Sequence, residues 1–500
     1  MTEPALEAFR IATYGPRRER IRRAVVATLA TGIGYYLSTG LGQLWALAWL
    51  APIPVLLVAY RETVARAALV ALLAHYLGSL NLFVYLATVL PLGLVPVVLL
   101  IPSIGFAASV AFGALAFERL PAWAAAFAFP VAWASFEFVS SLVSPHGTAI
   151  SQAYSQTDWL PLLQIASVTG VFGITFVLAL VPSAIAATWR TRTLGAWLPT
   201  LAVAIVALGF GVVRLHSAPD TETLRVGLAE TDKDVAAAFE TERVDLATIV
   251  ANAYANRIER LAHDGAQLIV LPEKLVGVTP VSAPVVRRIF SDAARDAHAT
   301  VVAGLNEVGI NPRRNVAVVF GPNGAVVAEY EKHHLLPGAE TGYEIGPTPG
   351  VVAGGPAVWG VAICKDMDFQ NWSRAYGVAG VRLLAVPAWD FVRDARLHAR
   401  MALVRAVENG FAMARVAQMG LIGAYDAYGR VLAEAPSETT GEVLLVHDLP
   451  LGPVGRTFYS RFGDVFATLC VAALVALLAW AMTSPPLRTV PAEEPEVWER

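Results

Sequence analysis

The sequence predicts a multi-pass α-helical membrane domain joined to an α/β domain. Of its 500 residues, 56% are hydrophobic and only 15% are charged, and the mean hydropathy is +0.55. A soluble protein carries about a quarter charged residues, so this composition indicates membrane insertion. Between about 222 and 455 the charges return, and short apolar runs alternate with amphipathic ones. The net charge of −3 argues against a nucleic-acid partner.

Eight apolar segments are each about long enough to cross ~30 Å of hydrocarbon as a helix. They lie at 24–39, 42–60, 65–87, 90–115, 121–143, 161–188, 194–213 and 465–482. We therefore expect a membrane domain of about seven helices over 1–215, an α/β domain over 222–455 and a C-terminal transmembrane helix over 465–482. The proline- and acid-rich residues 485–500 predict a disordered tail.

Arginines fall in alternate connections between these segments. They are Arg10, Arg17, Arg18, Arg20, Arg22 and Arg23 in the N-terminal tail, then Arg61 and Arg66, Arg119, and Arg190 and Arg192. The intervening connections at 40–41, 88–89 and 144–160 hold no Lys or Arg. By the positive-inside rule, the N-terminus is expected to be cytoplasmic and the α/β domain to lie on the outer side of the membrane.

The α/β region is expected to form a layered domain, because its strands and helices lack regular βαβ spacing. The predicted strands are 224–228, 267–271, 300–305, 315–320, 325–330, 357–364, 382–386, 412–417 and 442–447, and the predicted helices are 234–264, 282–297, 369–378 and 394–409. A Gly-Pro-Asn-Gly turn at 321–324 predicts a hairpin between two of these strands.

Three of the predicted strands each lead to one chemically active side chain. Glu273 follows the run 267–272, Lys332 follows the run 325–331, and Cys364 ends the run 357–364. Strand ends beside loops are where a rigid sheet can hold reactive groups. A carboxylate, an ammonium and a thiol would supply a base, a charge stabiliser and a nucleophile.

Each of the three residues also has a purely structural interpretation. Cys364 could be a buried cysteine of the core, Glu273 a surface carboxylate and Lys332 a solvated strand end. The second cysteine, Cys470, lies in the last apolar segment, so we expect no disulfide and a free thiol at Cys364. Neither a metal site nor a cofactor is predicted, since the adjacent histidines at 333–334 are expected to point in different directions and no glycine-rich phosphate loop is present.

Considered together, the three motifs resemble the carbon–nitrogen hydrolase (nitrilase) superfamily over about 222–455. They are Leu-Pro-Glu at 271–273, Tyr-x-Lys-x-x-Leu-x-Pro-x-x-Glu at 330–340 and Gly-Val-x-Ile-Cys at 360–364. The resemblance implies a nitrilase-like α-β-β-α sandwich with Glu273 as general base, Lys332 stabilising the tetrahedral intermediate and Cys364 as acyl-accepting nucleophile. Glu340 falls where the superfamily often has a supporting glutamate.

A nitrilase-like domain between seven apolar segments and one more resembles the bacterial apolipoprotein N-acyltransferases. The residues that carry this resemblance are Glu137, Tyr154-Ser155-Gln156, the run 163–176, Pro387-Ala388-Trp389-Asp390, and His398, Met401, Arg405 and Glu408. Glu137 either is hydrogen-bonded in the bundle or supports substrate, since intramembrane carboxylates are costly and often functional. Trp389 either lines the pocket or belongs to the core.

The resemblance implies an enzyme of the bacterial inner membrane that transfers an acyl chain from a phospholipid, through a thioester on Cys364, to the N-terminal amine of a diacylglyceryl-cysteine lipoprotein. Two features depart from the family pattern. Lys365-Asp366 stand where Tyr-Glu usually follows the cysteine, and the segment 341–351 is short. Asp366 could keep the carboxylate role, and Lys365 could lower the thiol pKa or point to solvent.

Two other functions remain open at this stage. One is a membrane-anchored amidase or nitrilase-like hydrolase that uses water as acceptor. The other is a catalytically inactive homologue that binds lipid or a partner protein. Lysophospholipid release that requires an amine acceptor would exclude the first alternative, and a thioester on Cys364 would exclude the second.

Overall fold

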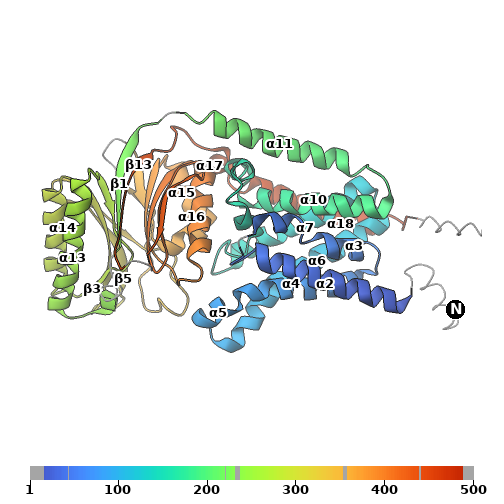
Figure 1. Ribbon diagram of the computed structural model, residues 1–500, viewed down its shortest axis with the longest axis horizontal. Helices are drawn as coiled ribbons and strands as arrows, with labels where there is room; N and C mark the ends of the chain where they lie inside the picture. Colours follow the sequence, from blue (N-terminus) through green and yellow to red (C-terminus); the bar gives the residue numbers. More distant parts are fainter. Residues whose placement is uncertain are drawn as a thin grey trace, which may run out of the picture.

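The computed structural model describes residues 16–42, 44–219, 221–230, 237–352, 357–437 and 441–487. A bundle of apolar helices and a layered α/β domain lie end to end, as Figure 1 shows. The predicted fold class is confirmed. Most of the predicted tail at 485–500 and Arg10 lie outside the described residues.

Among the described residues, six helical segments are long and apolar enough to cross a membrane. They are Val64–Val89, Leu92–Arg119, Ala122–Val143, Val171–Thr191, Trp197–His216 and Val465–Thr483. The first comprises α4 (Val64–Ser79) and α5 (Phe83–Val89), the second contains α6 (Val95–Arg119), and the others are α7, α10, α11 and α18 in that order. Leu-, Val- and Ala-rich sequences favour helix where all backbone groups must bond internally.

Two of the eight predicted segments are not among these six. The segment 24–39 corresponds to α2 (Arg17–Ser38) from residue 24 onward together with its C-cap Thr39, and the first seven residues of this helix are charged except for Ile21. The segment 42–60 is divided into a 3-10 helix, η1 (Trp45–Trp49), and a short helix, α3 (Ile53–Ala59). Pro52 and Pro54 at this junction lack the N–H groups that a continuous helix would need.

The segment 161–188 is also interrupted. It begins with the short helices α8 (Leu160–Leu163) and α9 (Ala166–Thr169), and α10 starts only at Val171. Gly170 separates α9 from α10 with a φ of 65°, a left-handed value that a glycine adopts without a Cβ clash. The chain therefore turns before it enters the bundle.

Connections that carry arginine meet at one end of the bundle. Arg20 at the start of α2 pairs with Glu62 after α3 at 2.5 Å. Arg119 at the end of α6 donates to the carbonyl of Ser484 after α18, at 3.2 Å. The α/β domain lies at the opposite end (Figure 1).

Two β-sheets face each other in the α/β domain. The first has the strand order β13-β1-β2-β4-β5-β6 with β3 beside β4, and the second has the order β12-β11-β10-β9-β8-β7. The strands are β1 (Thr223–Glu230), β2 (Leu268–Val270), β3 (Val276–Val278), β4 (Thr300–Glu307), β5 (Arg314–Phe320), β6 (Val326–Glu331), β7 (Gly350–Val352), β8 (Trp359–Val361), β9 (Leu383–Trp389), β10 (Ala412–Gln418), β11 (Leu421–Tyr425), β12 (Val431–Pro436) and β13 (Val443–Pro450).

Helices cover the outer face of each sheet, which completes the α-β-β-α sandwich. Helices α13 (Val244–His263) and α14 (Ala283–Asp296) cover the first sheet, while α15 (Gln370–Val378) and α16 (Ala395–Asn409) lie between the second sheet and the membrane helices (Figure 1). Apolar residues such as Val270, Val361 and Ala414 fill the space between the sheets. Their alternation along each strand places one face of each sheet in this core.

The predicted elements differ from the structure mainly at their ends. The strand predicted at 357–364 is confined to β8 (Trp359–Val361), and Cys364 instead begins a 3-10 helix, η6 (Cys364–Asp368). The helix predicted at 234–264 is present as α13 from Val244 onward. Strands β3, β7, β11 and β12 were not predicted. Strands β3 and β7 have only three residues each, and β12 is only partly buried, so these three carry a weak sequence pattern.

Helix α16 joins the two halves through buried polar contacts within a continuous apolar core. Arg405 and Glu408 of this helix are fully buried and pair with each other at 2.6 Å. Arg405 Nη2 donates to the hydroxyl of Tyr154 (2.8 Å), and the N–H of Val171 at the start of α10 donates to Glu408 Oε1 (2.8 Å). The pair itself lies within α16 and is costly to break, and the two hydrogen bonds to Tyr154 and Val171 link the helix to the membrane half.

Candidate active site

Glu273 lies just beyond β2, in a bend where its carboxylate is almost completely buried. The residue is 2% exposed. Its Oε1 accepts hydrogen bonds from Lys332 Nζ (2.8 Å) and Asn315 Nδ2 (2.7 Å). Its Oε2 has no hydrogen-bond partner among the residues that the structure describes. The surface interpretation of Glu273 is therefore wrong, and one carboxylate oxygen is left to take up a proton.

Lys332 follows β6 and is buried with two carboxylates. Its Nζ lies 2.8 Å from Glu273 and 3.0 Å from Glu340 Oε2, and the side chain is 3% exposed. Burial opposes the ammonium charge, but the carboxylates of Glu273 and Glu340 outweigh it and raise the pKa of Lys332 well above its usual value. Lys332 is thus a fixed positive charge and not a solvated strand end.

Glu340 contacts Lys332 and Asn315, the two residues that donate hydrogen bonds to Glu273. It pairs with Lys332 and, at 2.6 Å, with Lys274, and it accepts a further hydrogen bond from Asn315 Nδ2 (2.9 Å). Burial alone would raise its pKa, but the two lysines lower the pKa of Glu340 to about 2. The supporting position predicted for Glu340 agrees with this geometry.

Cys364 begins η6 with a φ of 44°, a left-handed conformation that is unfavourable for a residue with a Cβ. The residue is partly exposed, and its thiol lies 3.4 Å from the carbonyl of Trp389. Burial and the charge of Glu273 raise the thiol pKa well above its usual value, while Lys332 opposes this rise. The structure therefore brings Glu273, Lys332 and Cys364 within electrostatic reach of one another.

Lys365 and Asp366, the two residues that follow the cysteine, are both buried. Asp366 is fully buried and accepts hydrogen bonds from the hydroxyl of Tyr330 (2.6 Å) and the N–H of His334 (2.8 Å). Lys365 is 4% exposed, and its Nζ lies 3.0 Å from His146 Nδ1. The solvent-facing alternative for Lys365 is wrong, while its effect on the pKa of the neighbouring thiol stays a prediction.

Trp389 lies at the end of β9 beside the thiol. Its ring packs edge-on against Phe239 at a centroid distance of 4.6 Å, and its Nε1 donates to the sulfur of Met419 (3.4 Å). Trp389 is only partly buried and Met419 is 38% exposed. These apolar groups form a partly open surface next to Cys364, so Trp389 is not a plain core residue.

Several residues of this site were not predicted. Asn315 bridges Glu273 and Glu340, and Lys274 pairs with Glu340. Arg415 Nη2 lies 2.6 Å from the buried Asp390 Oδ1 beside the thiol. A charged residue in the otherwise apolar strand run 412–417 was a signal for Arg415, but nothing local distinguishes Asn315.

The adjacent histidines and Glu137 are accounted for by local contacts. The rings of His333 and His334 lie 4.5 Å apart and stack on Trp372 and Phe369, so the expectation that they diverge is wrong. Glu137 accepts hydrogen bonds from the Thr175 hydroxyl (2.7 Å) as well as from Ser151 and the backbone of Gln152. This geometry agrees with the structural interpretation of the intramembrane carboxylate.

His398 makes the stability of the folded protein depend on pH. Its Nε2 lies 2.9 Å from Asp394 Oδ2. Burial opposes the imidazolium charge, but Asp394, Asp368 and Asp390 outweigh it and raise the pKa of His398 to about 9. An unfolded histidine titrates near about 6.5, so the stabilisation is complete below that pH and is lost as the pH rises through about 9.

Thermal unfolding in detergent should therefore show a loss of stability on the order of 3 kcal/mol as the pH rises from about 6.5 to about 9.5. His398→Gln should be less stable at the lower pH and should lose less on alkalinisation. Equal pH slopes for the two proteins would contradict the ion pair with Asp394.

Comparisons with known proteins agree with this architecture. The apolipoprotein N-acyltransferase N-terminal domain matches residues 31–185, and the carbon-nitrogen hydrolase family matches residues 242–459. The chain is 28% identical over 399 residues to an apolipoprotein N-acyltransferase of Geobacter metallireducens (71% of this chain, 74% of that protein) and 25% identical over 396 residues to one of Shewanella oneidensis (71% and 73%).

Among solved structures, an amidase from Nesterenkonia sp. aligns over 50% of this chain and 95% of that one, with 22% identity and a TM-score of 0.40. The two family matches lie in different halves of the chain, and the alignment to the Geobacter protein spans 71% of the chain. The chain therefore joins the N-terminal domain of the apolipoprotein N-acyltransferases to a carbon–nitrogen hydrolase domain, and it is similar over about 71% of its length to proteins of that name.

Proposed function

We propose that this protein transfers an acyl chain from a membrane phospholipid, through a thioester on Cys364, to the N-terminal amine of a diacylglyceryl-cysteine lipoprotein. The observation that carries the proposal is the state of Glu273. One of its oxygens is held by Lys332 and Asn315, while the other has no partner among the described residues, and the charge of the carboxylate acts on the Cys364 thiol and raises its pKa. That arrangement suits general-base activation of a nucleophile.

The first half-reaction forms the acyl-enzyme. Glu273 accepts the thiol proton as Sγ of Cys364 bonds to the ester carbonyl carbon, and the carbonyl oxygen becomes an oxyanion. The ammonium of Lys332 and the N–H of Lys365 stabilise this charge, because fixed donors in a water-poor site need no reorganisation. The C–O bond of the ester then breaks, and Glu273 returns its proton to the departing lysophospholipid.

The second half-reaction consumes the thioester. The lipoprotein amine attacks the thioester carbonyl, Glu273 accepts a proton from the amine nitrogen, and the thiolate of Cys364 leaves and is reprotonated. Exclusion of water from the site favours the amine over hydrolysis. Lys332 remains charged throughout, since its two carboxylate neighbours raise its pKa.

An intact-protein mass measurement tests this mechanism directly. Incubation with phospholipid should add one acyl chain to the wild-type protein, and hydroxylamine should remove it. Lysophospholipid release should continue only when an N-terminal diacylglyceryl-cysteine peptide is added. Free fatty acid released without that peptide would indicate a hydrolase, and the absence of any adduct would indicate an inactive homologue.

We also propose that the protein lies in the bacterial inner membrane with a cytoplasmic N-terminus and an outward-facing α/β domain. The basic connections gather at one end of the bundle, as shown by the contacts Arg20–Glu62 and Arg119–Ser484. The α/β domain is seated at the other end, and the positive-inside rule assigns the basic end to the cytoplasm. A reporter fused near residue 230 should be active only outside the cytoplasm, and activity inside would reverse the assignment.

A further inference from the structure

The turn that carries Cys364 is seated on a loop of the membrane half. This loop, residues 144–148, follows α7 and is called the α7 loop below. The N–H and hydroxyl of Thr148 both donate to the carbonyl of Asp368 in η6, at 3.1 and 2.9 Å. A Cβ on Gly147 would lie only 2.4 Å from that carbonyl oxygen, so the backbones are in close contact.

A side-chain contact joins the residue after the nucleophile to the same loop. Lys365 Nζ lies 3.0 Å from His146 Nδ1 and 3.3 Å from Asp368 Oδ2. Burial and the charge of Lys365 lower the pKa of His146 to about 4, so the imidazole is neutral at physiological pH. Nδ1 of His146 therefore accepts a hydrogen bond from the Lys365 ammonium.

The other side of the turn is fixed within the α/β domain. Asp366 accepts hydrogen bonds from Tyr330 and His334, which flank Lys332 in the sequence. Cys364, with its φ of 44°, immediately precedes the residues that make these two attachments. Such a conformation costs on the order of 1–3 kcal/mol and persists only where the surroundings hold it.

The charges around Lys365 balance one another, so the cluster is closed and does not offer an anion site. Asp368 faces both Lys365 and His398, and Asp394 faces His398. Two cations are thus matched by two carboxylates, and His146 adds a neutral acceptor. The arrangement is that of a structural clamp on the turn.

We propose that His146 and Lys365 are positioning residues, through which the membrane half holds the Cys364 turn in its reactive conformation. The inference rests on the proposed function, because it assigns the pair to the thioester-forming step. The nucleophile then acts only when the α/β domain is seated on the α7 loop. The chemistry is thereby tied to the bundle, where lipid substrates arrive.

Lys365→Met tests the clamp, since it keeps the aliphatic stem and removes the donor. In the full-length protein, the rate of Cys364 acylation at saturating phospholipid should fall by about 10- to 100-fold, while KM changes less than about two-fold. Alkylation of Cys364 by iodoacetamide, which needs no lipid site, should slow as well. His146→Phe should have the same effects, and His146→Asn, which keeps an acceptor near the Nδ1 position, should restore most of the rate.

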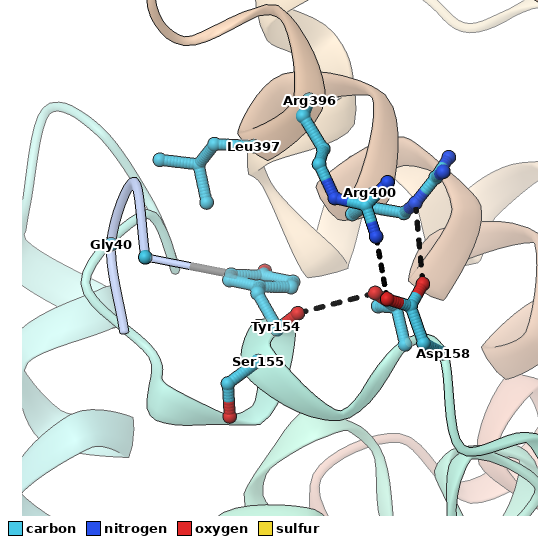
Figure 2. Close-up of a pocket in the computed structure, with 9 residues that line it drawn as sticks. Gly40, Tyr154, Ser155, Asp158, Arg396, Leu397 and Arg400 are labelled. Carbon is cyan, nitrogen blue, oxygen red and sulfur yellow. Dashed lines mark hydrogen bonds and ion pairs between the residues drawn. The ribbon is translucent and has the colours of Figure 1, made fainter. Parts of the chain in front are cut away.

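Arg396→Gln is the matched control, because it breaks another ion pair between the two halves without touching η6. Figure 2 shows Arg396 and Arg400 of α16 directed at Asp158, and the Arg396–Asp158 distance is 2.5 Å. This variant should acylate at the wild-type rate. Wild-type rates in both Lys365→Met and His146→Phe, or equal losses in His146→Asn and His146→Phe, would overturn the proposal.

The outcome is distinguishable from failure of the proposed function. If the wild-type protein forms no acyl adduct, the function itself is wrong, whatever the variants do. If it forms the adduct and the clamp variants form it equally fast, only the positioning role is wrong. Thermal midpoints measured beside each rate separate slow acylation from unfolding.

Discussion

Replacing Cys364 by Ala is expected to abolish turnover, lowering kcat/KM by at least about 10³-fold. The substitution removes the only atom that can carry the acyl group between donor and acceptor, so no partial route through the thioester remains. Because Cys364 is only partly buried and its Sγ contacts the carbonyl of Trp389 at 3.4 Å, removing the sulfur should preserve the fold. Lysophospholipid release and the intact-protein mass measure both effects.

The second cysteine provides the matched control. Cys470 is buried in α18, far along the chain from η6, and Cys470→Ala should retain both turnover and the acyl adduct. An adduct lost in Cys470→Ala but kept in Cys364→Ala would show that Cys470, and not Cys364, is the acylated thiol. Turnover near the wild-type level in Cys364→Ala would contradict a thioester on Cys364.

Glu273→Gln is expected to reduce the acylation rate by about 10³-fold, because an amide of the same shape cannot take up the thiol proton. The thiol pKa is raised by burial, so without a base very little thiolate forms at neutral pH. Lys332 keeps its ion pair with Glu340, and the site should therefore stay assembled. Single-turnover acylation, followed by mass against time, measures the loss.

A carboxylate outside the site serves as the control for this substitution. Glu329 on β6 pairs with Arg287 at 2.8 Å and is more exposed than Glu273. Glu329→Gln should acylate at the wild-type rate. A wild-type rate in Glu273→Gln would mean that another group accepts the proton, and a lowered thermal midpoint in that variant would assign the loss to unfolding.

The order and chemistry of the site follow from local sequence patterns. Apolar runs that end in Glu273, Lys332 and Cys364 can be recognised one at a time, because strand alternation and strand ends depend on neighbouring residues alone. The hairpin at 321–324 is of the same kind, and Gly324 has the positive φ that such turns require. Residues whose importance comes from pairing across the fold, such as Asn315, carry no such signal.

By itself the sequence determined the two-part architecture, the basic connections of the bundle and the three candidate site residues, since composition, periodicity and motif spacing are properties of the chain. Only the tertiary structure decided that Cys364 begins a 3-10 turn, that Lys365 is buried against His146, and that the segment 42–60 is broken. The reason is physical. The direction of a side chain and the conformation of a turn depend on what packs against them, and those partners come from distant segments of the chain.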